Sequence, residues 1–292
     1  MYYYILNPAA GDGAINQLQE KLRARLNQIQ ISGEFAKTTG PGEATKMTEA
    51  AIAKGYTTVV AVGGDGTVNE VMNGITKDNV ALGIIPIGHT NRLAKHLGIN
   101  NWQQACEVLA ARRLINYSLM AAGQHYFLSS LKIGFESELD KQVETPGKTI
   151  RQRAKHLSTG WGQAQDYQTL TANIKVDDSY EMDCELFTLT IANQRFINPS
   201  ADNKLVVSLS DKPSAIKRAN YVWQLMRGQR PLEDSATSYF HANRLLLSTT
   251  PETGVRIDGK LASRTPIAVR LTDRQVRFIC EKPPTGFKPE SL

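Results

Sequence analysis

Short apolar runs alternate with amphipathic segments through the first third of the chain, and this alternation limits the fold more than any other feature. Each strand-like run is followed by apolar residues at three- and four-residue steps, the spacing of one helix face. The expected strands are 2–6, 31–36, 57–62 and 81–85, and the expected helices are 12–29, 43–54, 66–75 and one from about residue 91. The run at 57–62 carries no charge, as expected of a strand covered on both faces. The pattern predicts a parallel sheet in a three-layer α/β domain.

After about residue 113 strand-like runs dominate the sequence. They lie at 114–121, 125–131, 171–176, 185–192, 204–209, 244–249, 254–257, 266–271 and 275–280. Apolar residues at helical spacing interrupt them at 149–168 and 214–227. A chain of 292 residues is long enough for two domains. We therefore expect an α/β domain at 1–115 and a mainly antiparallel β domain at 116–282. The polar tail at 283–292 is expected to fray or to pack back on the first domain.

Composition excludes several classes of protein. No apolar stretch approaches the roughly 18 residues that a membrane span needs, and a strand-like run starts at residue 2, which leaves no room for a signal peptide. Cys106, Cys184 and Cys280 are far apart and lack metal-ligand spacing, so we expect reduced thiols in a cytoplasmic protein. The net charge of +6 suits an anionic partner, either a phosphate-bearing ligand or an anionic membrane surface.

The stretch GGDGTVNE, residues 63–70, follows the third expected strand and opens a helix. Glycines let the backbone approach a ligand closely, and a helix N-terminus presents N–H groups to anions. A carboxylate at Asp65 repels phosphate unless a divalent cation lies between them, so the stretch indicates a phosphate site with a metal. The alternative is a tight turn in which Asp65 and Thr67 cap the helix. The stretch lacks the GKS or GKT of a Walker A loop.

Two further polar turns follow the first and fourth expected strands. They are NPAAGDGA at 7–14 and IPIGHTNR at 85–92. The carboxyl ends of parallel strands meet at one edge of a sheet, where ligands bind in open α/β folds. A single histidine such as His89 is more often a cap or a surface residue than a catalyst. Three such turns together nevertheless predict a ligand cleft at this edge.

These motifs resemble a known family. NPAAG at 7–11, GGDGTVNEVMNGI at 63–75 and LGIIPIGHTNRLAKHLGI at 82–99 resemble the catalytic domain of diacylglycerol kinases and bacterial lipid kinases. The likeness continues in FLSSLKIGFESELDKQVETPGK at 127–148 and IDGK at 257–260. The resemblance implies an N-terminal three-layer α/β nucleotide-binding domain, a mainly antiparallel β-sandwich domain and an active-site cleft between them. It also implies transfer of the γ-phosphate of ATP, with Mg²⁺, to a lipid hydroxyl such as that of diacylglycerol.

The resemblance also assigns site residues by matching positions. The implied metal ligands are Asp65 and, from a shortened acidic loop at 201–203, Asp202. The implied nucleotide-binding residues come from all of the polar turns. They are Asn7, Gly11, Thr38, Thr39, Gly63, Gly64, Asp65, Gly66, Thr67, Asn69, Glu70, Gly88, His89 and Asn91.

The chain departs from the family pattern at three positions. His89 stands where the family has an ATP-contacting threonine, Arg92 where it has an acidic residue, and Lys260 where it has the glutamate taken as general base. A base must be unprotonated and within reach of the hydroxyl. The candidates for that role are therefore Asp65, Glu136 and Asp258, whereas Lys260 is a candidate for binding phosphate as a point charge.

Three functions remain open at this point. The first is an active lipid kinase, and the second is a degenerate homologue that binds nucleotide or lipid without phosphoryl transfer. The third, an NAD kinase relative, shares GGDGT but is disfavoured by the NEVxNG continuation and the following PxG turn. The kinase prediction includes a lipid substrate and no nucleic-acid polymer, with a homodimer as an alternative to a monomer. It also includes contact with the inner face of a membrane through the basic segments 148–156 and 217–230, which could equally be helices packed on the β domain.

Overall fold

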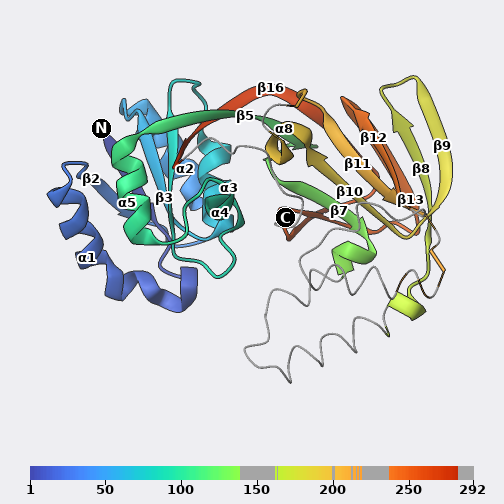
Figure 1. Ribbon diagram of the computed structural model, residues 1–292, viewed down its shortest axis with the longest axis horizontal. Coiled ribbons are helices and arrows are strands. Elements are labelled where there is room, and N and C mark those ends of the chain that lie inside the picture. The colour runs from blue at the N-terminus through green and yellow to red at the C-terminus, as the bar shows by residue number, and fades with distance from the viewer. Residues whose placement is uncertain are drawn as a thin grey trace. The chain divides into compact units, whose positions relative to one another are not determined.

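The computed structural model describes residues 1–138, 162, 164–198, 201–211, 213, 214, 216, 218 and 237–281. The chain divides into two compact units (Figure 1). The first unit comprises Met1–Leu119 and Thr272–Gly286, and the second comprises Met120–Leu271 and Phe287–Leu292. The basic segments 148–156 and 217–230 and the tail 283–292 lie outside the described residues, as does most of the two expected helices at 149–168 and 214–227.

The first unit alternates strands and helices as the sequence predicts. Its elements are β1 (Tyr2–Leu6), the short 3-10 helix η1 (Ala10–Gly13), α1 (Ala14–Gln28), β2 (Gly33–Lys37), α2 (Glu43–Ala53), β3 (Thr58–Gly63), α3 (Asp65–Gly74), β4 (Ala81–Pro86), α4 (Arg92–His96) and α5 (Trp102–Ala111). The strand β5 (Arg113–Ala122) begins in this unit and continues into the second.

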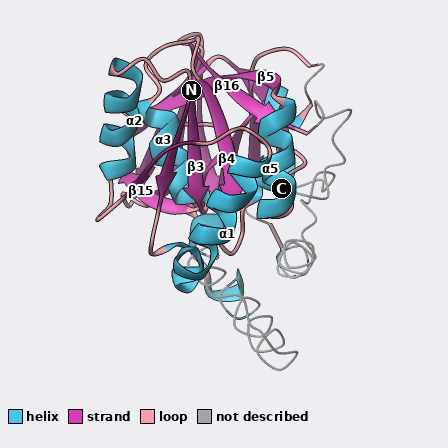
Figure 2. Ribbon diagram, turned by 90° about the vertical axis from the view of Figure 1, so that its left-hand side faces the viewer, coloured by secondary structure: helices cyan, strands magenta, loops and turns pink. Residues whose placement is uncertain are grey.

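The strands of the first unit form a parallel sheet in the order β2-β1-β3-β4. Every residue of β3 and β4 is buried, as expected of central strands with helices on both faces. Figure 2 shows α2 and α3 together on one face of this sheet, with α1 and α5 on the other. The three-layer α/β architecture predicted from the sequence is confirmed.

One strand of this sheet comes from the far end of the chain. The last part of β16 (Ile267–Cys280) pairs in parallel with β4, joining Arg277 to Ala81 and Phe278 to Leu82. From the sequence we expected two separate strands here, 266–271 and 275–280, both in the second domain. The structure has one continuous strand that contributes to both units.

The second unit is built of antiparallel strands. Besides parts of β5 and β16 it contains β6 (His125–Phe127), β7 (Ser130–Gly134), β8 (Leu170–Val176), β9 (Tyr180–Leu186), β10 (Thr188–Asn193), the short helix α8 (Gln194–Ile197), β11 (Leu205–Ser210), β12 (Thr237–Ala242), β13 (Arg244–Thr250), β14 (Gly254–Ile257) and β15 (Lys260–Arg264). One sheet has the order β12-β11-β10-β7-β14-β15, and a second layer runs β16-β13-β8-β9.

An apolar core lies between these two layers. Central strands contribute alternate residues to it, for example Leu131 and Ile133 from β7 and Leu245 and Leu247 from β13. All of these side chains are fully buried. The second unit is therefore a β-sandwich, and the predicted mainly antiparallel β domain is confirmed.

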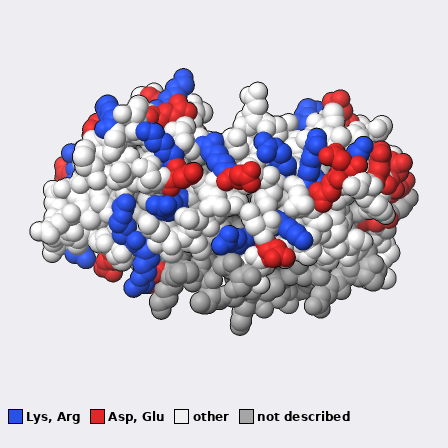
Figure 3. Space-filling view, turned by 90° about the horizontal axis from the view of Figure 1, so that it is seen from above, with Lys and Arg blue, Asp and Glu red and all other residues white. Residues whose placement is uncertain are grey.

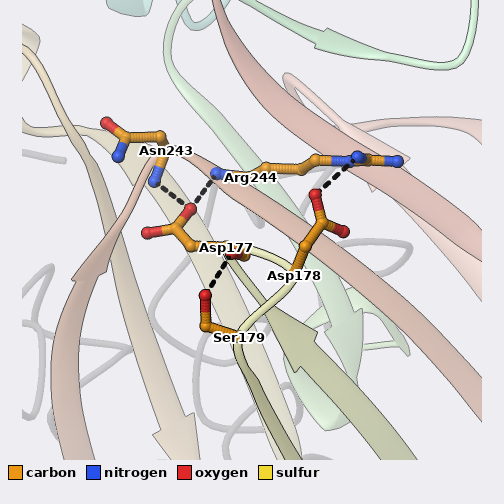
Figure 4. A network of polar contacts seen from close by, with 5 residues as sticks. All are labelled: Asp177, Asp178, Ser179, Asn243 and Arg244. Carbon is orange, nitrogen blue, oxygen red and sulfur yellow. Dashed lines mark hydrogen bonds and ion pairs between the residues drawn. The ribbon is translucent and has the colours of Figure 1, made fainter.

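Two neighbouring turns of the sandwich are tied together by carboxylates (Figure 4). Asp177 and Asp178 form the turn between β8 and β9 at positive φ. The Asp177 Oδ1 atom accepts hydrogen bonds from the backbone nitrogens of Asn243 and Arg244, at 2.9 and 2.8 Å. The Asp178 carboxylate forms an ion pair of 2.9 Å with the Arg244 guanidinium. These contacts fix the β8–β9 turn against the turn that precedes β13.

Charges of both signs lie on the face shown in Figure 3, where Lys and Arg side chains alternate with Asp and Glu. Acidic side chains gather at the right-hand end of this view. Within the described part of the chain, no helix combines the length and the hydropathy needed to cross a bilayer.

Candidate functional site

The turn between β3 and α3 touches the turn after β4 through glycine backbones. Gly63 ends β3, and Gly64 precedes Asp65, the first residue of α3. A Cβ atom placed on Gly88 would lie 2.6 Å from the Gly64 Cα atom, closer than real side chains allow. Glycine at these positions therefore lets the two turns meet at the carboxyl edge of the sheet. At the same edge, the first N–H groups of α3 have no partner within the helix, an arrangement that favours anions.

The turn after β1 is joined to α3 by a side-chain hydrogen bond. Asn7 donates from Nδ2 to the Thr67 hydroxyl at 2.9 Å, and its Oδ1 atom accepts from the Ala9 nitrogen at 3.0 Å. Gly11 in the same turn has φ 59°, in the left-handed region that glycine adopts without strain. The structure thus brings Asn7 and Thr67, both predicted site residues, into one contact.

The Asp65 carboxylate is held by the turn after β4. Its Oδ2 atom accepts from the Thr90 hydroxyl at 2.7 Å, and its Oδ1 atom accepts from the Leu93 backbone nitrogen at 3.3 Å. Asn91 closes the same turn by hydrogen bonds of both side-chain amide atoms to the backbone of Gly88, at 3.1 and 2.6 Å. Sequence reasoning did not include Thr90 among the site residues, because its contact with Asp65 spans 25 residues of chain.

His89 bridges the third turn to the first. Its Nε2 atom lies 3.4 Å from the Asp12 Oδ1 atom, and both side chains are largely exposed. Asp12 was not predicted as a site residue, although it lies within the quoted turn at 7–14. The structure therefore places His89 at the predicted edge, with a carboxylate from the turn after β1 beside it.

Thr38 and Thr39 follow β2, and both form hydrogen bonds with other residues of the first unit. Thr38 is buried, and its backbone nitrogen donates to the Leu6 carbonyl at 2.9 Å. Thr39 donates to the Glu43 carboxylate from its backbone nitrogen and, at 2.8 Å, from its hydroxyl. These two hydrogen bonds hold the pKa of the Glu43 carboxyl below its usual value. Thr38 thus extends the pairing with β1, and Thr39 organises the entry to α2.

Asn69 and Glu70 lie one turn into α3; Asn69 contacts Asn73 of the same helix, and the Glu70 side chain contacts α2. The Glu70 Oε2 atom accepts from the Ala44 nitrogen at 3.3 Å in the first turn of α2, where the helix dipole favours a carboxylate. The Asn69 carbonyl and Oδ1 atoms accept from Asn73 at 2.9 and 3.2 Å. The predicted role of Glu70 in the nucleotide site stays a prediction, and its observed contact anchors α2 to α3.

In the second unit, Asp258 forms the hairpin between β14 and β15 with Gly259. Both residues have positive φ, 50° and 87°, which is the backbone of a two-residue hairpin turn. The Asp258 Oδ1 atom accepts from the Ser129 nitrogen at 3.2 Å, the Ser129 hydroxyl at 2.8 Å and the Ser130 nitrogen at 3.1 Å. Asp258 thus fastens this hairpin to the start of β7.

Glu136 is a buried carboxylate immediately after β7. It lies 3.3 Å from the Lys132 ammonium, and the two side chains are only 8% and 14% exposed. Its Oε2 atom also accepts from the Thr190 hydroxyl of β10 at 3.1 Å. Lys132 lies within the stretch 127–148 that resembles the family, but it was not predicted as a site residue.

The remaining predicted residues of the second unit are exposed. Lys260 starts the edge strand β15, and Asp202 lies in the loop before β11. Among the residues that the structure describes, no three His, Cys, Asp or Glu side chains are grouped as a metal site would require. A site that uses Asp65 therefore needs ligands from the substrate as well, which is the usual manner of binding Mg²⁺ in nucleotide sites.

Fold and site together are typical of proteins that bind a phosphate-bearing ligand at the edge of a parallel sheet, and the comparisons with known proteins narrow this class. The family model of the diacylglycerol kinase catalytic domain matches residues 1–122. A diacylglycerol kinase of Bacillus subtilis is 26% identical over 278 residues, which cover 90% of each chain.

Solved structures show the same fold. A structure described as a diacylglycerol kinase from Bacillus anthracis has a TM-score of 0.71 at 20% identity, covering 100% of this chain and 98% of the other. An NAD kinase from Archaeoglobus fulgidus in complex with ATP has a TM-score of 0.53 at 11% identity, covering 96% of this chain and 93% of that one. The resemblance to the diacylglycerol and lipid kinase family is therefore confirmed, and residues 1–122 carry the pattern of its catalytic domain.

Proposed function

We propose that this protein is an ATP-dependent lipid kinase that transfers the γ-phosphate to a lipid hydroxyl such as that of diacylglycerol. The observation that carries the proposal is the contact between the glycine turn of α3 and the turn after β4, in which Thr90 and Leu93 hold Asp65 at the N-terminus of α3. Phosphoryl transfer depends mainly on positioning and on stabilising charge, and this edge supplies both. The match to the diacylglycerol kinase catalytic domain over residues 1–122 supports the same conclusion.

Mg²⁺ fits the donor set at this edge. A carboxylate oxygen has two lone pairs, and each oxygen of Asp65 accepts one hydrogen bond from the described residues, so both retain capacity for a cation. A cation held by Asp65 would neutralise charge on the phosphate groups. In the proposal, backbone N–H groups at the start of α3 bind phosphate oxygens, while Asn7 and Thr67 keep the turn after β1 in place.

The proposal extends to a membrane lipid as acceptor and to contact with the membrane surface that presents it, with the chain acting as a monomer or a homodimer. Sedimentation with vesicles of anionic and of neutral lipid tests the contact, and analytical ultracentrifugation tests the assembly. Binding to anionic vesicles alone would support an electrostatic contact. Binding to neither would restrict the proposal to lipids dispersed in detergent.

The decisive experiment measures phosphoryl transfer from labelled ATP to a panel of lipids in mixed micelles. Asp65→Asn preserves the size of the side chain and can still accept hydrogen bonds, but it removes the charge. We expect it to lower transfer by about 100-fold or more. Asp78→Asn is the matched control, because Asp78 is exposed in the loop after α3 and makes no side-chain contact among the described residues. Labelled phospholipid formed equally by both variants would contradict the role assigned to Asp65, and no labelled phospholipid with the unmodified chain would contradict the proposal itself.

A homologue that binds nucleotide without phosphoryl transfer is the second candidate. It is favoured by the environment of the hairpin at 258–260, where Asp258 already accepts three hydrogen bonds and Lys260 is a cation. ATP binding by calorimetry without transfer to any lipid would establish this alternative. Transfer that depends on Asp65 would exclude it.

A further inference from the structure

Arg92 is an exposed guanidinium at the same edge of the first unit's sheet. It is the first residue of α4, and its side chain forms no hydrogen bond or ion pair with any residue that the structure describes. The chain is held on both sides of it, because Thr90, two residues before, and Leu93, the next residue, both donate to the Asp65 carboxylate. Consecutive Cα atoms are about 3.8 Å apart, so the Arg92 side chain starts within one residue of a group bonded to Asp65.

The charges of Asp65 and Arg92 remain separate in this arrangement. No ion pair joins them, and the carboxylate is satisfied by a hydroxyl and a backbone N–H group instead. The same edge of the sheet therefore presents an anion suited to a metal, at the start of α3, and a cation suited to phosphate, at the start of α4. A guanidinium binds phosphate oxygens directly, with two parallel hydrogen bonds and no metal between them.

We propose that Arg92 contacts the phosphate groups of the bound nucleotide directly, so that part of the affinity for ATP does not require a divalent cation. The inference rests on the nucleotide site of the proposed function. Asp65 then contributes to nucleotide binding through the cation, whereas Arg92 contributes by direct contact with the phosphate oxygens. The expected ligand of Arg92 is a di- or triphosphate chain, because its charge exceeds that of a monophosphate.

The experiment measures ATP binding by calorimetry in Mg²⁺ and in EDTA, for the wild-type chain, Arg92→Gln and Asp65→Asn. Inorganic tripolyphosphate in EDTA serves as a second probe that lacks the nucleoside. We expect wild type to bind both probes in EDTA, and Arg92→Gln to weaken that binding about tenfold, the loss of a charge-assisted hydrogen bond at an exposed site. Asp65→Asn should lose the gain that Mg²⁺ provides and keep the binding in EDTA. Arg92→Lys should recover part of the loss, since it restores charge without the planar fork.

Lys95→Gln is the matched control, because Lys95 is an exposed cation on the same helix α4. It removes the same charge one turn further along and should leave both affinities unchanged. An equal loss in Lys95→Gln would assign the effect to net charge and overturn the inference. Unchanged binding in Arg92→Gln would also overturn it, while leaving the proposed function intact. ATP binding that is absent even in Mg²⁺ would instead refute the nucleotide site on which both rest.

Discussion

The ion pair of Lys132 and Glu136 offers the sharpest test of the energetics of the second unit. The two charges lie 3.3 Å apart, and the side chains are 14% and 8% exposed. In the register of the sheet, Lys132 faces Thr190 of β10, whose hydroxyl donates to Glu136. Replacement of Lys132 by methionine keeps the length of the side chain and leaves a buried carboxylate with a hydroxyl but without this cation.

Removal of one partner from a buried pair costs about 3–5 kcal/mol. The Thr190 hydrogen bond survives in Lys132→Met, so we expect a loss of about 3 kcal/mol in the free energy of unfolding. For a unit of this size that corresponds to about 10 °C in the melting temperature. The double variant Lys132→Met with Glu136→Leu removes both charges and should regain most of the loss, because it leaves no uncompensated ion.

Urea denaturation followed by circular dichroism measures these free energies. The control is Lys204→Met, the same substitution at an exposed position at the start of β11, and it should change stability by less than about 0.5 kcal/mol. The reasoning is refuted if Lys132→Met costs no more than the control, or if the double variant is less stable than either single one. The same proteins test Glu136 as general base: a Glu136→Gln variant that transfers phosphate as fast as wild type would remove it from the candidates.

Three further predictions concern other parts of the chain. Asp177→Ala removes two hydrogen bonds to backbone nitrogens and should lower the free energy of unfolding by about 1–2 kcal/mol. Asp178→Ala, at similar positive φ, loses only an exposed ion pair worth at most about 1 kcal/mol. A larger loss of stability at Asp178 than at Asp177 would contradict this order. Burial lowers the pKa of His96 to about 4, so the unfolded chain takes up the proton first as pH falls. Stability should therefore fall between pH 6.5 and 4 by up to about 3 kcal/mol, a loss that His96→Gln abolishes in urea titrations at each pH. Gly88→Ala places a Cβ atom 2.6 Å from a Cα atom of the facing turn and should abolish ATP binding, while Gly40→Ala, with no atom within 4 Å, should bind ATP normally in the same calorimetric assay.

Most helices and strands of the first unit could be predicted because their apolar residues follow a local periodicity. The strands at 2–6 and 58–63 and the helices between them differ sharply in apolar spacing, so the sequence identifies them without long-range information. The pairing of β16 with β4 joins residues almost 200 positions apart in the chain. Nothing in the local pattern of 267–280 indicates that this strand begins in the second unit and ends in the sheet of the first. The edge strands of the second unit were missed for another reason. β9 and β15 are rich in charged and polar residues, because they have neighbours on one side only and are largely exposed.

The candidate site likewise has residues that local sequence signals predict and residues that they do not. The glycine turn at 63–66 was predictable because a buried strand, glycines and a helix start are all local signals. The residues that hold this turn in place, Asn7 and Thr90, reach it from 60 and 25 positions away in the chain. The resemblance placed Asn7 at the site, but neither contact could be read from spacing. Both depend on which strands the fold brings side by side.

The hairpin at 258–260 shows why a matching motif does not by itself assign a catalytic role. Asp-Gly is the dipeptide that a two-residue hairpin with positive φ requires, and the Asp258 carboxylate bonds three donors of Ser129 and Ser130. Folding alone therefore gives a reason for Asp258 and Gly259. Lys260 lies just outside the turn, at the exposed start of an edge strand, where folding places little demand on the side chain. The loss of a glutamate at this position leaves the hairpin intact, so whether the chain transfers phosphate depends on the carboxylates that remain and, first among them, on Asp65.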